Sequence, residues 1–167
     1  MATWSTPAFF EIDYHYKQND KNNKSYIFNL ISRIVLNYEE DVAVYTVKAA
    51  TDPKVENRLI IYRPQGNITS QLNLISSWEK KKGRTLKRSH VPEEEIIKLS
   101  ENLPFPDNIP VAILHNIFIK GEQMSFELTE NDLEASKLYP DYKYTSVDNL
   151  LDICLVNPPK PKLSEFA

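Results

Sequence analysis

The sequence predicts an α/β fold with one hydrophobic core. Helical patterns alternate along the chain with single short β-rich runs, as expected when helices pack against strands. The 167 residues are enough for one domain, and 41% hydrophobic with 26% charged residues is ordinary for a globular protein. No segment repeats another, so we treat the chain as one unit.

The first elements that the pattern defines lie between residues 33 and 62. Ile34–Leu36 is typical of a short buried strand. Asn37 with Glu40 three residues later resembles a capping box, which predicts a helix that Asp52–Pro53 ends. Its inward face holds Val42, Tyr45 and Ala49. The β-rich run Leu59–Tyr62 predicts a central strand.

A second helix and strand follow in the middle of the chain. Thr69 or Ser70 caps a helix that ends in three lysines and Gly83, because cations in the last turn followed by glycine favour a helix stop. The residues expected to face inward are Leu72, Ile75 and Trp78. The segment 85–91 predicts a short strand, and Pro92 with three following glutamates predicts the start of another helix.

The C-terminal third contains the most apolar segments. Residues 109–120 are apolar almost all round, which predicts a helix buried on several sides or lining an apolar cavity. Residues 124–128 alternate in polarity, which predicts a half-buried strand. The last helix is capped by Thr145 or Ser146. Its core stripe is Val147, Leu150, Leu151, Cys154 and Leu155.

These patterns divide the chain into three parts. Residues 1–32 contain aromatic residues and then a polar tract, but no helical stripe, so this N-terminal segment is left unassigned. Residues 33–156 form the predicted domain. Residues 157–167 are proline-rich and predict an extended tail.

Composition excludes several classes of function. The net charge of −3 and the pI near 5.7 argue against a nucleic-acid-binding protein. No apolar run approaches the roughly 18 residues of a membrane span, and no secretory signature is present, so a cytoplasmic location is expected. A single cysteine, Cys154, cannot form an internal disulfide; its place on an apolar helix face indicates core packing.

Cofactor and metal sites are not expected in this chain. The three glycines, Gly66, Gly83 and Gly121, are far apart, whereas a phosphate-binding loop needs glycines within about six residues. The three histidines are also isolated, and no spacing of Cys or His fits a metal site.

Two polar features each allow two interpretations. The basic run from Lys80 to Arg88 is either an anion-binding patch or, as we favour, a helix terminus followed by an exposed strand. His115 interrupts the apolar helix, where helical spacing aligns it with Val111 and Phe118. It is either a core histidine bonded to a backbone carbonyl, or the one polar group of an apolar small-molecule pocket.

Several blocks in order resemble the C-terminal part of the isoflavone-reductase-like group of plant NmrA-type, atypical short-chain reductases. That group includes isoflavone, pinoresinol–lariciresinol, phenylcoumaran benzylic ether and leucoanthocyanidin reductases. The blocks are Tyr38–Val42, Tyr45–Lys48, Asp52-Pro53, Tyr62–Pro64, Trp78–Lys81, Gly83–Leu86, His115–Gly121, Glu134-Ala135, Leu138–Asp141 and Tyr142–Asp148. Their order and spacing agree over about residues 37–155.

The resemblance implies that the two halves of a full-length relative have different roles. In that family an N-terminal Rossmann domain binds NADPH and supplies a lysine for proton transfer, while the C-terminal part covers a phenolic or phenylpropanoid substrate. It thus strengthens the pocket interpretation of Val111, His115 and Phe118, and it transfers no catalytic residue. Residues 1–32 look unrelated to the cofactor half, and in the parent fold the strand at 59–62 would pair with the Rossmann sheet.

The predicted fold is therefore the substrate-side portion of an NmrA-type, Rossmann-like reductase without the dinucleotide-binding sheet. The leading hypothesis is the substrate-binding portion of an NADPH-dependent oxidoreductase that is inactive as this truncated chain. The alternative is a non-catalytic binding or regulatory module, which keeps an aromatic-ligand cleft or dimerises with a full-length relative.

Overall fold

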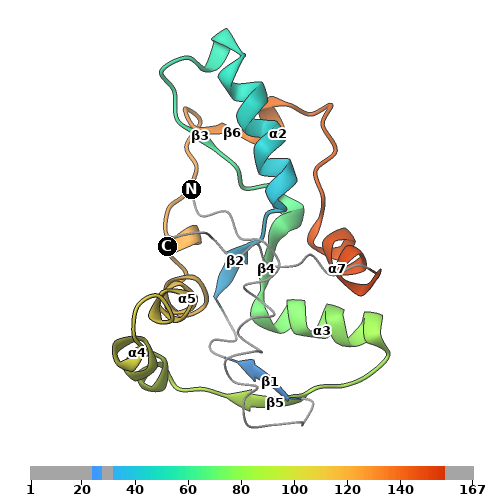
Figure 1. Ribbon diagram of the computed structural model, residues 1–167. Coiled ribbons are helices and arrows are strands. Elements are labelled where there is room, and N and C mark those ends of the chain that lie inside the picture. The colour runs from blue at the N-terminus through green and yellow to red at the C-terminus, as the bar shows by residue number, and fades with distance from the viewer. Residues whose placement is uncertain (1–23, 28–31, 157–167) are drawn as a thin grey trace.

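The computed structural model describes residues 24–27 and 32–156, and it confirms the α/β prediction (Figure 1). The predicted tail and most of the unassigned N-terminal segment lie outside these residues. The strands are β1 (Lys24–Ile27), β2 (Arg33–Val35), β3 (Ile60–Ile61), β4 (Ile68–Ser70), β5 (Lys87–His90) and β6 (Leu133–Glu134). The helices are α2 (Glu39–Ala50), α3 (Gln71–Lys82), α4 (Glu93–Asn102), α5 (Asn108–Leu114), α6 (Ala135–Leu138) and α7 (Val147–Val156).

The described strands form three separate two-stranded sheets. β1 pairs in parallel with β5, β2 pairs antiparallel with β4, and β3 pairs in parallel with β6. Figure 1 shows β3 and β6 beside α2 at one end of the molecule and β1 with β5 at the other. On either side of the β2–β4 pair, α4 packs against α5, and α3 against α7.

The strand predicted at Leu59–Tyr62 is present but shorter, and among the described strands it is not central. The strand contains only Ile60 and Ile61, and its partner is β6. Leu59 is 72% exposed, so it lies outside the sheet. At the other end, the backbone N–H of Arg63 donates to the side chain of Glu134 at 3.0 Å. The Glu134 carboxylate thus takes the place of the backbone carbonyl that would accept this N–H in a longer sheet. The pairing of β3 with β6 therefore ends at this point.

Helix boundaries follow the sequence signals closely, but two caps differ from prediction. Ser70 caps α3 by accepting from the N–H of Asn73, and Gly83 ends it in the left-handed conformation (φ 64°), as predicted. The capping box at Asn37 does not form. Its side-chain amide donates instead to the carbonyl of Tyr62 at 3.2 Å, so this side chain joins two elements. Pro92 is the N-cap of α4 instead of its first residue.

One predicted helix face and one predicted strand also need correction. In α3 the buried apolar residues are Leu74 and Ile75, whereas Leu72 and Trp78 are only half-buried. The predicted strand at residues 124–128 is absent, because a 3₁₀ turn occupies Glu122–Met124. Its Gln123 side chain accepts the backbone N–H of Val35 at 2.9 Å, and this bond ties the turn to β2.

The last helix and the apolar segment at 109–120 are confirmed. In α7 the buried residues are Val147, Leu150, Leu151 and Cys154, the expected stripe except for Leu155, which is half-buried. Ser146 accepts from the N–H of Asn149. The apolar segment is helical throughout, since α5 continues into a π-helical turn, His115–Ile119.

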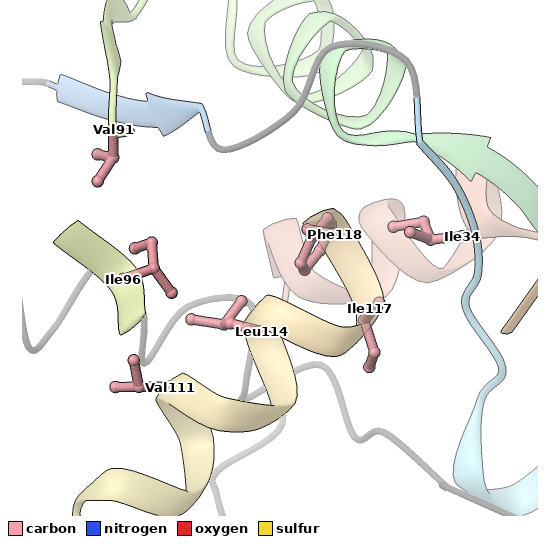
Figure 2. Close-up of a cluster of buried hydrophobic side chains, with 7 residues drawn as sticks. All are labelled: Ile34, Val91, Ile96, Val111, Leu114, Ile117 and Phe118. Atoms are coloured by element: carbon pink, nitrogen blue, oxygen red, sulfur yellow. The ribbon is translucent and has the colours of Figure 1, made fainter. Parts of the chain in front are cut away.

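Among residues 32–156 the core is divided into three apolar clusters. The largest lies between α4, α5, the π turn and β2 (Figure 2). Its buried members are Ile34, Val91, Ile96, Val111, Leu114, Ile117 and Phe118. A second cluster joins Tyr45 and Tyr62 to Ala135, and a third joins Leu74 of α3 to Val147 and Leu151 of α7. Each cluster joins segments that are distant in sequence.

A buried carboxylate lies beside the second cluster. Asp41 of α2 is 3% exposed and accepts hydrogen bonds from the hydroxyl of Tyr142 (2.8 Å) and the backbone N–H of Thr145 (2.6 Å). The hydroxyl of Thr145 also donates to it, at 3.3 Å. Buried charges are tolerated when their acceptor positions are filled in this way. Asp41 therefore fixes the approach to α7 against α2.

Candidate functional site

The helical segment that contains the predicted site runs from α5 through the π turn. Residues 108–114 form α5, and the next five residues form the wider turn, in which the N–H of Lys120 donates to the carbonyl of His115 at 3.0 Å. Gly121 follows with φ 66°, a left-handed conformation that glycine adopts at little cost. Single π turns within helices occur frequently at functional sites.

The structure places Val111 and Phe118 in the largest apolar cluster. Both side chains are buried, at 4% and 5% exposure. In Figure 2, Val111 lies near Ile96 of α4, whereas Phe118 lies farther along the helix, on the side of Ile34. The π turn widens the backbone between them, so the straight stripe expected from α-helical spacing is not maintained to Phe118. The two residues belong to one cluster but contact different parts of it.

His115 lies at the edge of this cluster and has a charged partner. Its Nε2 is 2.7 Å from Oε1 of Glu93, the first residue of α4. The histidine side chain is 14% exposed and that of Glu93 is 48% exposed. The partner is thus a carboxylate on a neighbouring helix, and not the backbone carbonyl expected of a core histidine. The pair joins the N-terminus of α4 to the start of the π turn.

Glu93 was missed as a site residue because its sequence context offered a complete explanation. Acidic residues in a first helical turn interact favourably with the helix dipole, and Glu93, Glu94 and Glu95 all do so. The contact with His115 depends on how α4 packs against α5. No local pattern in the sequence distinguishes Glu93 from the two glutamates that follow.

Lys81, Lys82 and Arg88 of the basic run at 80–88 contact other residues of the fold. Lys81 forms ion pairs with Asp148 and Asp152 of α7, at 3.0 and 2.6 Å. Arg88 pairs with Glu79 at 2.9 Å. The backbone N–H of Leu86 and the guanidinium of Arg88 lower the pKa of Glu79. These contacts favour the structural interpretation of the run over an anion-binding patch.

The described part of the chain shows neither a metal site nor a membrane-spanning helix. Within residues 24–27 and 32–156, no three side chains of His, Cys, Asp or Glu come together as a metal site. None of the helices in these ranges combines the length and apolarity needed to cross a bilayer.

Comparison with known proteins identifies the family. The NmrA-like family model matches residues 3–151. Isoeugenol synthase 1 of Petunia hybrida is 58% identical over 165 residues, which cover 98% of this chain and 51% of that protein. Isoflavone reductase has a similar solved structure, with 34% identity and a TM-score of 0.69 over 80% of this chain and 44% of that chain.

A further solved structure is AtPrR2 with NADP+ and (+)pinoresinol. It is 30% identical, with a TM-score of 0.73 over 80% of this chain and 43% of that chain. The chain thus spans about half the length of the relatives it matches.

The matched residues extend the resemblance toward the N-terminus. Both the family model and the Petunia relative include most of residues 1–32. The expectation that this segment is unrelated to the family is therefore wrong, whereas the boundary at residue 32 stays a prediction. The family match, the 58% identity and the shared architecture together show that this chain belongs to the NmrA-like family, in its isoflavone-reductase-like group.

Proposed function

We propose that this chain forms the substrate-binding part of an NADPH-dependent reductase of phenolic, phenylpropanoid-type compounds. The observation that carries the proposal is the 58% identity to isoeugenol synthase 1, since the aligned residues cover 98% of this chain. The structure solved with NADP+ and (+)pinoresinol supports the same cofactor and a related aromatic ligand. Val111, His115 and Phe118 are the residues proposed to contribute to the substrate side.

The geometry around His115 supports a ligand of this type. The residue offers one hydrogen-bonding ring beside a large apolar cluster, and small-molecule sites commonly combine apolar walls with a few polar groups. A phenol presents the matching combination of a flat apolar ring and one hydroxyl. In the proposed complex the ligand hydroxyl lies near His115, and the ring packs on the half-buried apolar residues one turn away, Ala112 and Ile119.

The described residues do not fit the nucleotide cofactor itself. Gly83 ends α3, Gly121 follows the π turn, and Gly66 lies against the hydroxyl of Tyr144. Each glycine serves a separate turn or contact, and none joins another in a phosphate-binding loop. In the proposed enzyme other residues hold NADPH, and we derive no step of hydride transfer from this part of the chain.

Ligand titration by NMR tests the proposal. Isoeugenol and its O-methylated analogue would be added separately to the ¹⁵N-labelled chain, to the His115→Phe variant and to a His90→Phe control in exposed β5. We expect weak binding of isoeugenol, with a Kd on the order of millimolar, and amide shifts at residues 111–119. His115→Phe should weaken isoeugenol more than its analogue, and His90→Phe should change neither. Shifts that avoid 111–119 would overturn the proposed site.

A further inference from the structure

We propose that Glu93 determines which ring nitrogen of His115 carries the proton, and thereby selects ligands whose oxygen donates a hydrogen bond. The selection of ligands rests on the function proposed above, whereas the state of the ring is a property of this chain alone. Glu93 is a positioning residue in this scheme, because it acts on the ligand through His115.

The chemistry of the contact assigns the proton. A carboxylate only accepts hydrogen bonds, and Glu93 presents its carboxylate from the first turn of α4. Its Oε1 is 2.7 Å from Nε2 of His115, so Nε2 must be the donor. In a neutral imidazole the other nitrogen then has no proton. Nδ1 is therefore an acceptor.

Packing between α4 and α5 keeps the side chains of Glu93 and His115 in contact. Ile96, one turn after Glu93, is 1% exposed and belongs to the same cluster as Val111 of α5. α4 and α5 are thus held together by the apolar residues drawn in Figure 2. Rotation of the His115 ring by 180° about Cβ–Cγ would break the bond to Glu93, because it puts the Cε1 carbon where Nε2 lies.

Nδ1 is available to a ligand. Among the described residues no hydrogen bond to it is found. The buried side-chain atoms without a partner in this part of the chain are the hydroxyls of Tyr45 and Tyr62 and the Oδ1 atoms of Asn67 and Asn108. Nδ1 of His115 is not one of them, and the histidine side chain is 14% exposed, so the ring is partly open to solvent.

An unprotonated Nδ1 distinguishes two classes of aromatic oxygen. A free phenol donates its O–H to Nδ1, whereas an aryl methyl ether has only lone pairs, which an acceptor nitrogen repels. Loss of one hydrogen bond of this kind weakens binding about fivefold. The pair would thus favour a free phenol over its methyl ether at the same position.

The test measures the protonation of the His115 ring and the binding of the ligand in separate experiments. Long-range ¹H–¹⁵N spectra at mildly alkaline pH report which imidazole nitrogen is protonated, and the His115 signals are identified by their loss in His115→Phe. We expect protonated Nε2 in the parent. Glu93→Lys places a donor against Nε2 and should move the proton to Nδ1. Glu94→Lys, which adds the same charge one residue later on an exposed position, should leave the ring unchanged.

The ligand pair completes the experiment. Preference for isoeugenol over its methyl ether should fall about fivefold in Glu93→Lys and persist in Glu94→Lys. Glu93→Gln, which retains the size of the side chain, covers the case in which the lysine variant does not fold; it should give a mixture of the two ring forms. An unchanged ring in a folded Glu93 variant would overturn the inference. Failure of both ligands to bind the parent would overturn the proposed function, while the ring spectra still decide the role of Glu93.

Discussion

The carboxylate of Asp41 accepts a 2.8 Å hydrogen bond from the hydroxyl of Tyr142, a residue 101 positions later in the chain. The same carboxylate accepts the backbone N–H of Thr145, which immediately precedes the last helix. One buried side chain therefore joins α2 to the C-terminal segment.

Asp41→Ala should lower the free energy of unfolding by about 2–4 kcal/mol, because it leaves the N–H of Thr145 and the hydroxyl of Tyr142 without their charged acceptor. Urea denaturation followed by circular dichroism measures the change. Glu39→Ala, in the same helical turn but exposed, should change stability by less than about 0.5 kcal/mol. Equal effects of the two substitutions would show that the bonds to Asp41 contribute little.

Two tyrosines of the second cluster should respond in opposite ways to loss of the hydroxyl. Tyr142→Phe removes the bond to Asp41 and should destabilise the fold by about 1–3 kcal/mol. The hydroxyl of Tyr45 is buried and has no hydrogen-bond partner among the described residues, so Tyr45→Phe should be neutral or stabilising. Parallel urea titrations decide this, and a larger loss in Tyr45→Phe would mean that its hydroxyl is bonded in solution.

Stability should fall in alkaline solution. Burial raises the pKa of Tyr45 to about 12, and burial with the bond to Asp41 raises the pKa of Tyr142 to about 12. In the unfolded chain a tyrosine ionises near pH 10. The folded state therefore holds more protons between about pH 10 and 12, and its stability decreases through this window. Urea midpoints measured across it should fall less steeply in the Tyr45→Phe, Tyr142→Phe double variant than in the parent.

Leu151→Asp should unfold the protein or lower its Tm steeply. Leu151 is 3% exposed and packs with Leu74 and Val147, so the substitution buries an unpaired charge. Asn149→Asp adds the same charge to an exposed position of the same helix and should leave the Tm nearly unchanged. A Leu151→Asp variant that melts with the parent would show that α7 is not docked.

The purified chain should not bind NADPH with micromolar affinity. Its three glycines are too far apart to form a phosphate-binding loop, and each serves a separate turn or contact. Calorimetry or the fluorescence of the reduced nicotinamide measures this directly. Saturable binding would require a cofactor site of a different kind.

The sequence predicted those parts of the fold that depend on local signals. The apolar stripe from Val147 to Cys154 depends only on α7, and the stop at Gly83 depends only on α3. Both were predicted correctly. The prediction of a strand at residues 124–128 was wrong because a strand forms only beside a partner strand. The alternating polarity of these residues does not show whether such a partner exists. Partner choice likewise explains why the sequence did not predict the pairing of the strand at Ile60 with β6.

The site was predicted less completely, and the reason is the same. His115 stood out because a polar residue interrupts an apolar segment. Glu93 and Asp41 did not, since each lies in an acidic first turn that the helix dipole already explains. Their roles arise from packing against residues on other elements. Burial of Asp41 depends on Tyr142 and Thr145, which lie more than a hundred positions away.

The pairing of β3 with β6 has a consequence for synthesis of the chain. Arg63 and Glu134, whose bond ends this sheet, are 71 positions apart. A ribosome adds about 5–20 residues per second, so several seconds separate the appearance of the two strands. During that interval the apolar residues of β3 have no partner, and an unpaired strand is prone to associate with other chains. A factor that shields residues 59–62 on the ribosome would therefore raise the yield of folded protein more than one that acts on the finished chain.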